Sequence, residues 1–265
     1  MGLMDGKRGV IFGIANDRSY AWYITKQLIA QGAQCAFTHL KMPDANSTMK
    51  MERRVRSAVE ELGVKDPWLM GCDAGNDADL DAVFDKLGAD FGKIDFVVHS
   101  IAFADRQFLE LGKFQTTTRA AWTQALDISA YTLLAMGQRA VKIMPDGGSI
   151  IAMTYYGGEK VIPGYNIMGV AKAALEHTCH YLAAELGEKK IRVNTISGGP
   201  LRTLAAMAVG GIQEMFEHQQ RKAPLKRNIE GEEVGNTAVY LLSDMASGVT
   251  GENIHVDAGF SIVGL

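Results

Sequence analysis

The stretch that decides the fold lies near the start of the chain, at residues 8–32: Arg-Gly-Val-Ile-Phe-Gly-Ile-Ala-Asn-Asp-Arg-Ser-Tyr-Ala-Trp-Tyr-Ile-Thr-Lys-Gln-Leu-Ile-Ala-Gln-Gly. Its first five residues predict a short buried strand that ends at Gly13. After the turn, Ala21, Ile24 and Leu28 recur at helical spacing, and Gly32 is a typical helix stop. A strand, a tight turn and an amphipathic helix in succession form the repeating unit of an α/β protein.

The same alternation continues through the rest of the chain. Further strands are expected at residues 34–38, 68–72, 94–98, 149–153, 191–196 and 253–256. Further helices are expected at 49–62, 77–91, 119–143, 165–186 and 232–243, with a loop over 40–48 and a loop that becomes a short helix over 197–220. No linker or repeat interrupts the pattern, so residues 1–265 are expected to form a single domain. The alternation predicts a Rossmann-type, doubly wound parallel sheet of about seven strands, with helices on both faces.

The composition excludes several classes of function. The formal net charge is −3, and no basic run is interleaved with aromatic residues, so no nucleic-acid partner is expected. No apolar run approaches the roughly 20 residues that span a bilayer, so no membrane insertion is expected. The three cysteines, Cys35, Cys72 and Cys179, lack metal-ligand spacing. They are expected to be buried free thiols in the cytoplasm, and no metal site is predicted.

Several residues come directly after the expected strands. Because the carboxyl ends of parallel strands lie at one edge of a sheet, these residues are expected to line a common site there. They are Gly13, Leu40, Asp73, His99 with Ser100, Thr154 with Tyr155, and Ser197.

The first turn and the next two strand ends suggest half of a dinucleotide site. The turn does not follow the Gly-x-Gly-x-x-Gly pattern, since only Gly13 is a glycine. The free N–H groups that open the next helix favour a pyrophosphate, and Ser19 either caps that helix or binds a phosphate oxygen. Residues 38–41, Thr-His-Leu-Lys, contain no acid to receive ribose hydroxyls, and Lys41 is placed either to meet a 2′-phosphate or to be solvated. Asp73 is placed either to bind the adenine amino group or to cap a helix.

Tyr165 and Lys172 suggest the other half of the site. They are seven residues apart, close to two helical turns, so both side chains are expected on one face of a helix that starts near Tyr165. A neighbouring ammonium lowers the pKa of a phenol, and it can also hold a ribose hydroxyl. The alternative is a pair of ordinary surface residues.

Taken together, four motifs resemble the bacterial enoyl-acyl carrier protein reductases, a divergent branch of the short-chain dehydrogenase/reductase superfamily. The motifs are Gly13-x5-Ser19-x-Ala21, His99-Ser100-Ile101-Ala102, Tyr155-x9-Tyr165-x6-Lys172 and Gly199-Pro200-Leu201-Arg202-Thr203, and the resemblance extends to residues 255–261. Ordinary members of the superfamily carry a serine thirteen residues before the catalytic tyrosine, where this chain has Ala152. The lack of that hydroxyl argues against the reduction of ketones.

The resemblance implies hydride transfer from NADH, with NADPH as the alternative, to the β-carbon of a trans-2-enoyl thioester carried on acyl carrier protein. It implies that Tyr165 stabilises the developing enolate and that Lys172 holds the nicotinamide ribose. It also implies that Tyr155 borders the acyl pocket and assists protonation of the α-carbon. Cofactor contacts are implied for Gly13, Ser19, Tyr20, Leu40, Asp73, Ala74, Ser100, Ile101, Leu201 and Thr203, and substrate contacts for Ala102 and Ala104. Many NADH-using members have Gln where Leu40 stands here. A homotetramer is also implied.

Two further expectations concern segments near the site. Residues 203–220 are interpreted as a lid over the acyl chain, because the apolar run is broken by Gly210 and Gly211; the alternative is a packed surface helix. His99 is expected to be an oriented core residue, because the implied chemistry gives it no proton to move. Two rival functions remain open: a short-chain reductase of a 3-oxoacyl thioester or ketone, and a non-catalytic nucleotide sensor on the same fold.

Overall fold

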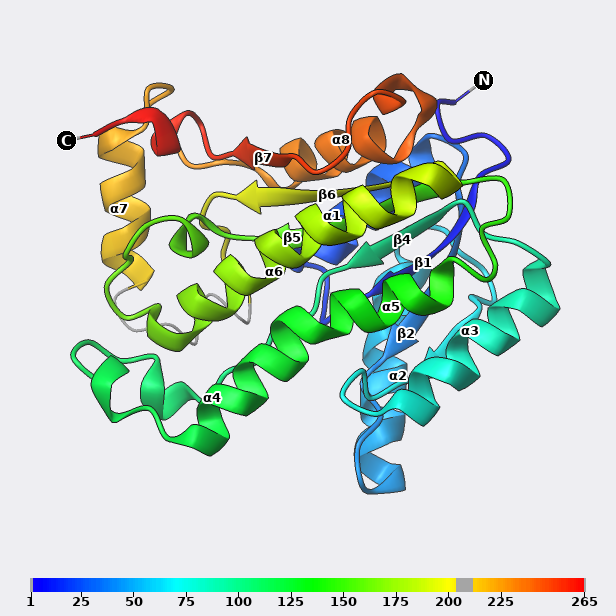
Figure 1. The fold of residues 1–265 in the computed structure, drawn as a ribbon, viewed down its shortest axis with the longest axis horizontal. Helices are drawn as coiled ribbons and strands as arrows, with labels where there is room; N and C mark the ends of the chain where they lie inside the picture. The colour runs from blue at the N-terminus through cyan, green and yellow to red at the C-terminus, as the bar shows by residue number, and fades with distance from the viewer. Residues whose placement is uncertain (1, 204–211, 265) are drawn as a thin grey trace.

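One twisted sheet runs through the middle of the molecule, with helices on both faces (Figure 1). The computed structural model describes residues 2–203 and 212–264. Seven strands pair in the order β3-β2-β1-β4-β5-β6-β7, and each neighbouring pair is parallel. The strands are β1 Arg8–Phe12, β2 Gln34–His39, β3 Leu69–Gly71, β4 Phe96–His99, β5 Gly148–Thr154, β6 Ile191–Gly198 and β7 Asn253–Val256. The predicted fold class is therefore confirmed.

The helices cover the two faces of the sheet in separate groups. They are α1 Tyr20–Ala30, α2 Ala45–Glu60, α3 Asp77–Phe91, α4 Arg119–Leu126, α5 Thr132–Ala140, α6 Asn166–Leu186, α7 Ile212–Lys222 and α8 Gly231–Leu242. Apolar side chains of α1, α2 and α8 form one buried cluster with one face of the sheet, and those of α3, α5 and α6 form another with the opposite face. No helix in the described part of the chain has both the length and the apolar character needed to cross a membrane.

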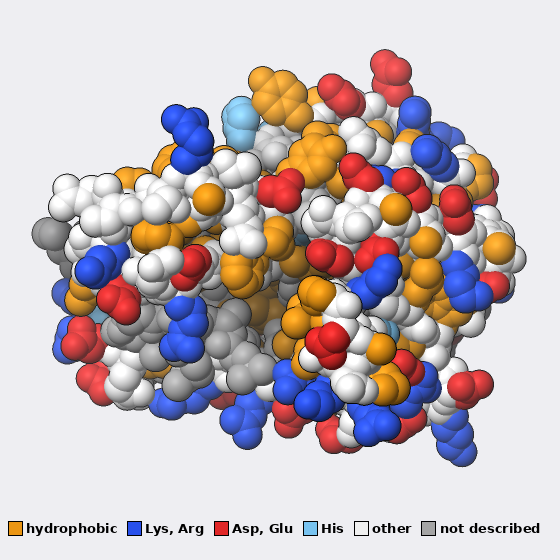
Figure 2. Space-filling view, turned by 90° about the horizontal axis from the view of Figure 1, so that it is seen from below, with side chains coloured by type: hydrophobic (Ala, Val, Ile, Leu, Met, Phe, Trp, Pro, Cys, Tyr) orange, Lys and Arg blue, Asp and Glu red, His pale blue; other side chains and the backbone are white. Residues whose placement is uncertain are grey.

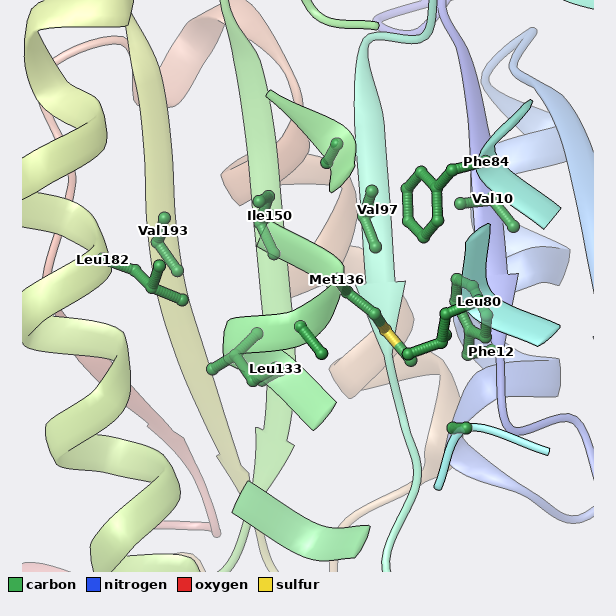
Figure 3. Close-up of a cluster of buried hydrophobic side chains, with 14 of the residues drawn as sticks. Val10, Phe12, Leu80, Phe84, Val97, Leu133, Met136, Ile150, Leu182 and Val193 are labelled. Atoms are coloured by element: carbon green, nitrogen blue, oxygen red, sulfur yellow. The ribbon is translucent and has the colours of Figure 1, made fainter. Parts of the chain in front are cut away.

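The alternation of side chains along each strand creates these two cores. In β1, Val10 and Phe12 belong to the cluster under α3 and α5, whereas Ile11 between them belongs to the cluster under α1. Figure 3 shows Val10 and Phe12 pointing toward Leu80 and Phe84 of α3. Because both faces are buried, the strands are apolar almost throughout.

The start of α2 differs from the sequence prediction. The segment 40–48 was expected to be a loop, but α2 already begins at Ala45. The Asp44 side chain accepts a hydrogen bond from the Ser47 N–H at 2.8 Å and so caps this helix. Asn46 and Ser47 are typical of turns, but they also occupy the first turn of helices, so composition alone misplaced the start.

The long helix expected over 119–143 is not uniform. It consists of α4, a π-helical segment at Asp127–Tyr131, and α5. The Ser129 hydroxyl exchanges two hydrogen bonds with the Phe103 backbone, accepting from its N–H at 3.0 Å and donating to its carbonyl at 3.1 Å. This segment therefore anchors the chain that follows β4. Such π segments are frequent at functional sites.

Candidate active site

The expected site residues do converge on one edge of the sheet. All seven strands are parallel, so the residues that follow β1 to β6 lie at the same edge. Strand order reverses between β1 and β4, because β2 lies on one side of β1 and β5 on the far side of β4. The crevice outside such a switch point is where open α/β sheets bind ligands.

The turn after β1 is built for a close approach at this switch point. Gly13 has φ +102°, and a Cβ at this position would clash with the Ser100 carbonyl oxygen at the end of β4. The Ser19 side chain caps α1, accepting from the Trp22 N–H at 3.3 Å and donating to the Asn16 carbonyl at 2.8 Å. The capping alternative for Ser19 is confirmed. The first turn of α1 carries no acidic residue, so its N-terminus remains favourable for an anion.

Tyr20 reaches farther into the site than its position in the turn suggests. Its hydroxyl donates a hydrogen bond to the carbonyl of Gly199, beyond the end of β6. Gly198 lies so close that a Cβ there would be 2.9 Å from the phenol oxygen. Burial, and secondarily the nearby Tyr155, raises the pKa of Tyr20 far above its usual value. The phenol thus links the first turn to the loop after β6.

Tyr155 and Tyr165 form an aromatic pair at the end of β5. Their ring centroids are 5.0 Å apart and the rings are nearly perpendicular, at 75°. Tyr165 occupies the N-cap position of α6, as expected. Burial raises the pKa of Tyr165, and the neighbouring Tyr155, Tyr20 and Glu176 act in the same direction. The prediction that Lys172 lowers this pKa is therefore wrong, because desolvation dominates.

Lys172 lies two turns farther along α6 and also faces the end of β5. It is buried, and its ammonium donates a hydrogen bond to the Met153 carbonyl at 2.8 Å. Burial lowers the pKa of Lys172 to about 8, and Glu176 opposes that shift. Both Tyr165 and Lys172 thus face the end of β5, which excludes the alternative of two ordinary surface residues.

The start of α6 is fixed by a residue that the sequence analysis did not single out. Asn166 has φ +44°, and its side-chain amide donates to the carbonyls of Phe108 at 2.8 Å and Glu110 at 2.7 Å. Asn tolerates positive φ better than most residues, which was the available signal. These bonds tie the turn beside Tyr165 to the segment after β4.

At the other end of the edge, the structure decides between the two alternatives for Asp73. Asn76, not Asp73, caps α3, so the capping alternative for Asp73 is wrong. The Asp73 carboxylate accepts a hydrogen bond from the Gly75 N–H at 3.0 Å. Asp73 also lines a cavity of about 730 Å³ that extends toward Phe108 and Thr118. Lys41 forms an ion pair with Asp79 at 2.5 Å. Leu40 beside it is half exposed.

The remaining predicted residues are placed as follows. Ala74, Ala104 and Thr203 are buried, Ser100, Ile101 and Leu201 are partly buried, and Ala102 is exposed. Ala104 packs in a small apolar cluster with Phe108 and Met168, next to Tyr165. Residues 204–211 of the expected lid lie outside the described residues, and α7 forms its final part.

His99 is a buried core residue, as predicted. Its Nε2 lies 2.7 Å from the Thr132 hydroxyl, and its Nδ1 has no partner among the described residues. Burial lowers the pKa of His99 to about 3, and the positive charge of Lys172 contributes in the same direction. The imidazole is therefore neutral at physiological pH.

These features fit a dinucleotide. The glycine at the switch point leaves room for a backbone approach, and the N-terminus of α1 carries no competing acid. Lys172 has three donors, one of which is directed at Met153, so two can serve ribose hydroxyls.

The fold and this arrangement of tyrosine and lysine define a short-chain dehydrogenase/reductase. The family model described as "Enoyl-(Acyl carrier protein) reductase" matches residues 13–261. The chain belongs to this family of nicotinamide-dependent oxidoreductases.

Individual relatives agree with that assignment over their full length. The chain is 50% identical to enoyl-[acyl-carrier-protein] reductase [NADH] 1 of Rhizobium meliloti, covering 100% of this chain and 93% of the relative. It is 46% identical to the [NADPH] enzyme FabI of Staphylococcus aureus, covering 98% of each. The crystal structure of the Bacillus cereus enoyl-acyl carrier protein reductase with NADP+ and indole naphthyridinone superposes with a TM-score of 0.94, at 45% identity and covering 100% of both chains.

Proposed function

We propose that this enzyme reduces a trans-2-enoyl thioester on acyl carrier protein to the saturated thioester, using NADH. The observation that carries the proposal is the buried Tyr155–Tyr165 pair beside Lys172 at the end of β5. Ala152 supports the choice of substrate. It lies fully buried in β5 and offers no hydroxyl to polarise a ketone.

The chain's own residues stabilise charge and hold the reactants. The nicotinamide cofactor, when bound, supplies the hydride. As negative charge develops on the thioester oxygen, the Tyr165 hydroxyl donates a hydrogen bond to it. The raised pKa keeps this phenol protonated and therefore able to donate. Lys172 binds ribose hydroxyls and keeps the local potential positive, while Tyr155 borders the acyl chain.

The choice of cofactor depends on the end of β2. Relatives of comparable identity carry NADH or NADPH in their names. Lys41 is the cation nearest in sequence to that strand end, and its charge is already paired with Asp79. That pairing supports NADH, because a 2′-phosphate would have to compete with a carboxylate for the ammonium.

An absorbance assay tests the proposal. Oxidation of NADH is followed first with crotonyl thioester and then with acetoacetyl thioester, and each is repeated with NADPH. We expect rapid oxidation with the crotonyl thioester and NADH. Oxidation with the acetoacetyl thioester alone would favour the ketone reductase, and tight cofactor binding without oxidation of either would favour the nucleotide sensor.

Two finer proposals concern assembly and compartment. We propose a homotetramer, supported by the family resemblance and by aromatic side chains exposed on α4, the π segment and α6, namely Trp122, Tyr131 and Tyr181. Light scattering of the purified protein tests it. We also propose a cytoplasmic location, supported by Cys35, Cys72 and Cys179, which are buried and free.

A further inference from the structure

Glu176 is a partly buried carboxylate that the chemistry above does not use. It lies one helical turn after Lys172 on α6, so both side chains lie on the same face of the helix. Its Oε1 accepts a hydrogen bond from the Thr154 hydroxyl at 2.6 Å, next to Met153, whose carbonyl binds Lys172. Gly158 lies against it, and a Cβ there would be 2.6 Å from the same oxygen. The carboxylate is thus held in place from two sides.

A second carboxylate, Glu159, pairs with a histidine, His255, nearer the surface. Glu159 follows Gly158, and its Oε1 lies 2.7 Å from His255 Nε2 on β7. The same oxygen accepts from the Asn253 amide at 2.8 Å. The side chains of Glu159 and His255 are 34% and 27% exposed, so both are in contact with solvent.

The charges around Lys172 show why a nearby carboxylate matters. Burial disfavours the ammonium of Lys172, and its positive charge in turn acts on the neutral His99 of β4. Glu176 is the group that raises the pKa of Lys172 against this desolvation. Glu176 itself is influenced by burial, by the Thr154 hydroxyl, and by the charges of Glu159, Lys172 and His255; its own charge also acts on Cys179.

We propose that Glu176 is a positioning residue for the reductase, which acts by keeping Lys172 protonated at neutral pH. Thr154 and the backbone of Gly158 hold the carboxylate. The charges of the partly exposed Glu159–His255 pair also act on it. The inference rests on the proposed function for the role of Lys172. The charge of Lys172 itself can be measured without substrate.

Glu176→Gln is the direct test, because the amide oxygen can still accept from Thr154 while the charge is lost. NMR of protein labelled at lysine Cε with ¹³C follows the titration of Lys172 in the free enzyme, and Lys172→Met identifies its signal. Removal of a nearby opposite charge is expected to lower the midpoint of Lys172 by about one pH unit. The alkaline decline of NADH binding, measured by fluorescence, should shift in the same direction.

Two further variants make the result specific. Glu185→Gln removes an exposed carboxylate from the same helix and should leave the midpoint unchanged. Glu176→Asp retains the charge and should largely preserve the Lys172 midpoint, even if packing is altered. The proposal fails if Glu176→Gln leaves the Lys172 midpoint in place, or if Glu176→Asp lowers it equally. Inactivity toward crotonyl thioester would overturn the proposed function instead, and would not affect this titration.

Discussion

Burial favours the neutral form of both Tyr165 and Lys172, with different consequences for each. The raised pKa of Tyr165 keeps a proton on the phenol, which suits a hydrogen-bond donor. The pKa of Lys172, lowered to about 8, brings its loss of charge close to the working pH. The packing around each residue therefore sets its protonation, and the charge of Glu176 raises the pKa of both Tyr165 and Lys172.

Tyr165→Phe should separate catalysis from folding. The phenol oxygen is the proposed donor to the developing oxyanion, and the loss of one such donor typically lowers kcat by about 10²–10³-fold. The unfolding midpoint and NADH affinity should change little. Tyr131→Phe, at an exposed tyrosine, is the control. A Tyr165→Phe enzyme with full activity would remove Tyr165 from the proposed mechanism.

The β1–α1 turn is the element that sets the geometry of the cofactor half of the site. It joins an inner strand of the sheet to a helix capped by Ser19, and its glycine lies against the end of β4. At the other half, Asn166 and the π segment fix α6 and α5 against the chain after β4. The site is therefore positioned by short connections rather than by long loops.

Gly13→Ala should destabilise the protein and weaken cofactor binding. Gly13 and Gly63 both have positive φ, but a Cβ at Gly63 would meet nothing within 4 Å, whereas one at Gly13 would meet Ser100. The loss of folding stability in Gly63→Ala therefore reports the backbone strain alone, about 1 kcal/mol. Urea unfolding should show a clearly larger loss for Gly13→Ala. Equal losses would mean that the contact with Ser100 is relieved without cost.

At the scale of the whole molecule, positive and negative side chains are mixed on the face shown in Figure 2. Figure 2 shows Lys and Arg interspersed with Asp and Glu on the face seen from below, with a hollow near its middle. The same view shows apolar side chains around that hollow.

Beneath the surface, the neutral His99 is fully buried, and its protonation is linked to unfolding.

Acid should destabilise the fold through His99. Its pKa is lowered to about 3 in the folded protein, against 6.5 when unfolded, so the unfolded state binds the extra proton between these values. This loss of folding stability is absent above pH 6.5 and grows as the pH falls. At pH 4.5 it reaches about 2–3 kcal/mol, at about 1.4 kcal/mol per pH unit.

His99→Gln should therefore lose less stability than the wild type between pH 7.0 and pH 4.5, as measured by urea unfolding. His180→Gln, at an exposed histidine, should follow the wild-type pH dependence. The same pH dependence in all three proteins would show that His99 is not the group that titrates.

The sequence by itself determined the sheet, the order of its elements and the family. These depend on local patterns: apolar strands, helical spacing, capping residues such as Ser19, and motifs such as Tyr165-x6-Lys172. The start of α2 was missed because the same residues favour turns and helix caps.

Only the tertiary structure decided the electrostatics of the site. The contacts of Tyr20 with Gly199, of Glu176 with Thr154 and of Lys41 with Asp79 join residues far apart in the chain. The pKa of Tyr165 rose instead of falling because desolvation depends on everything packed around the phenol, which no spacing in the sequence records.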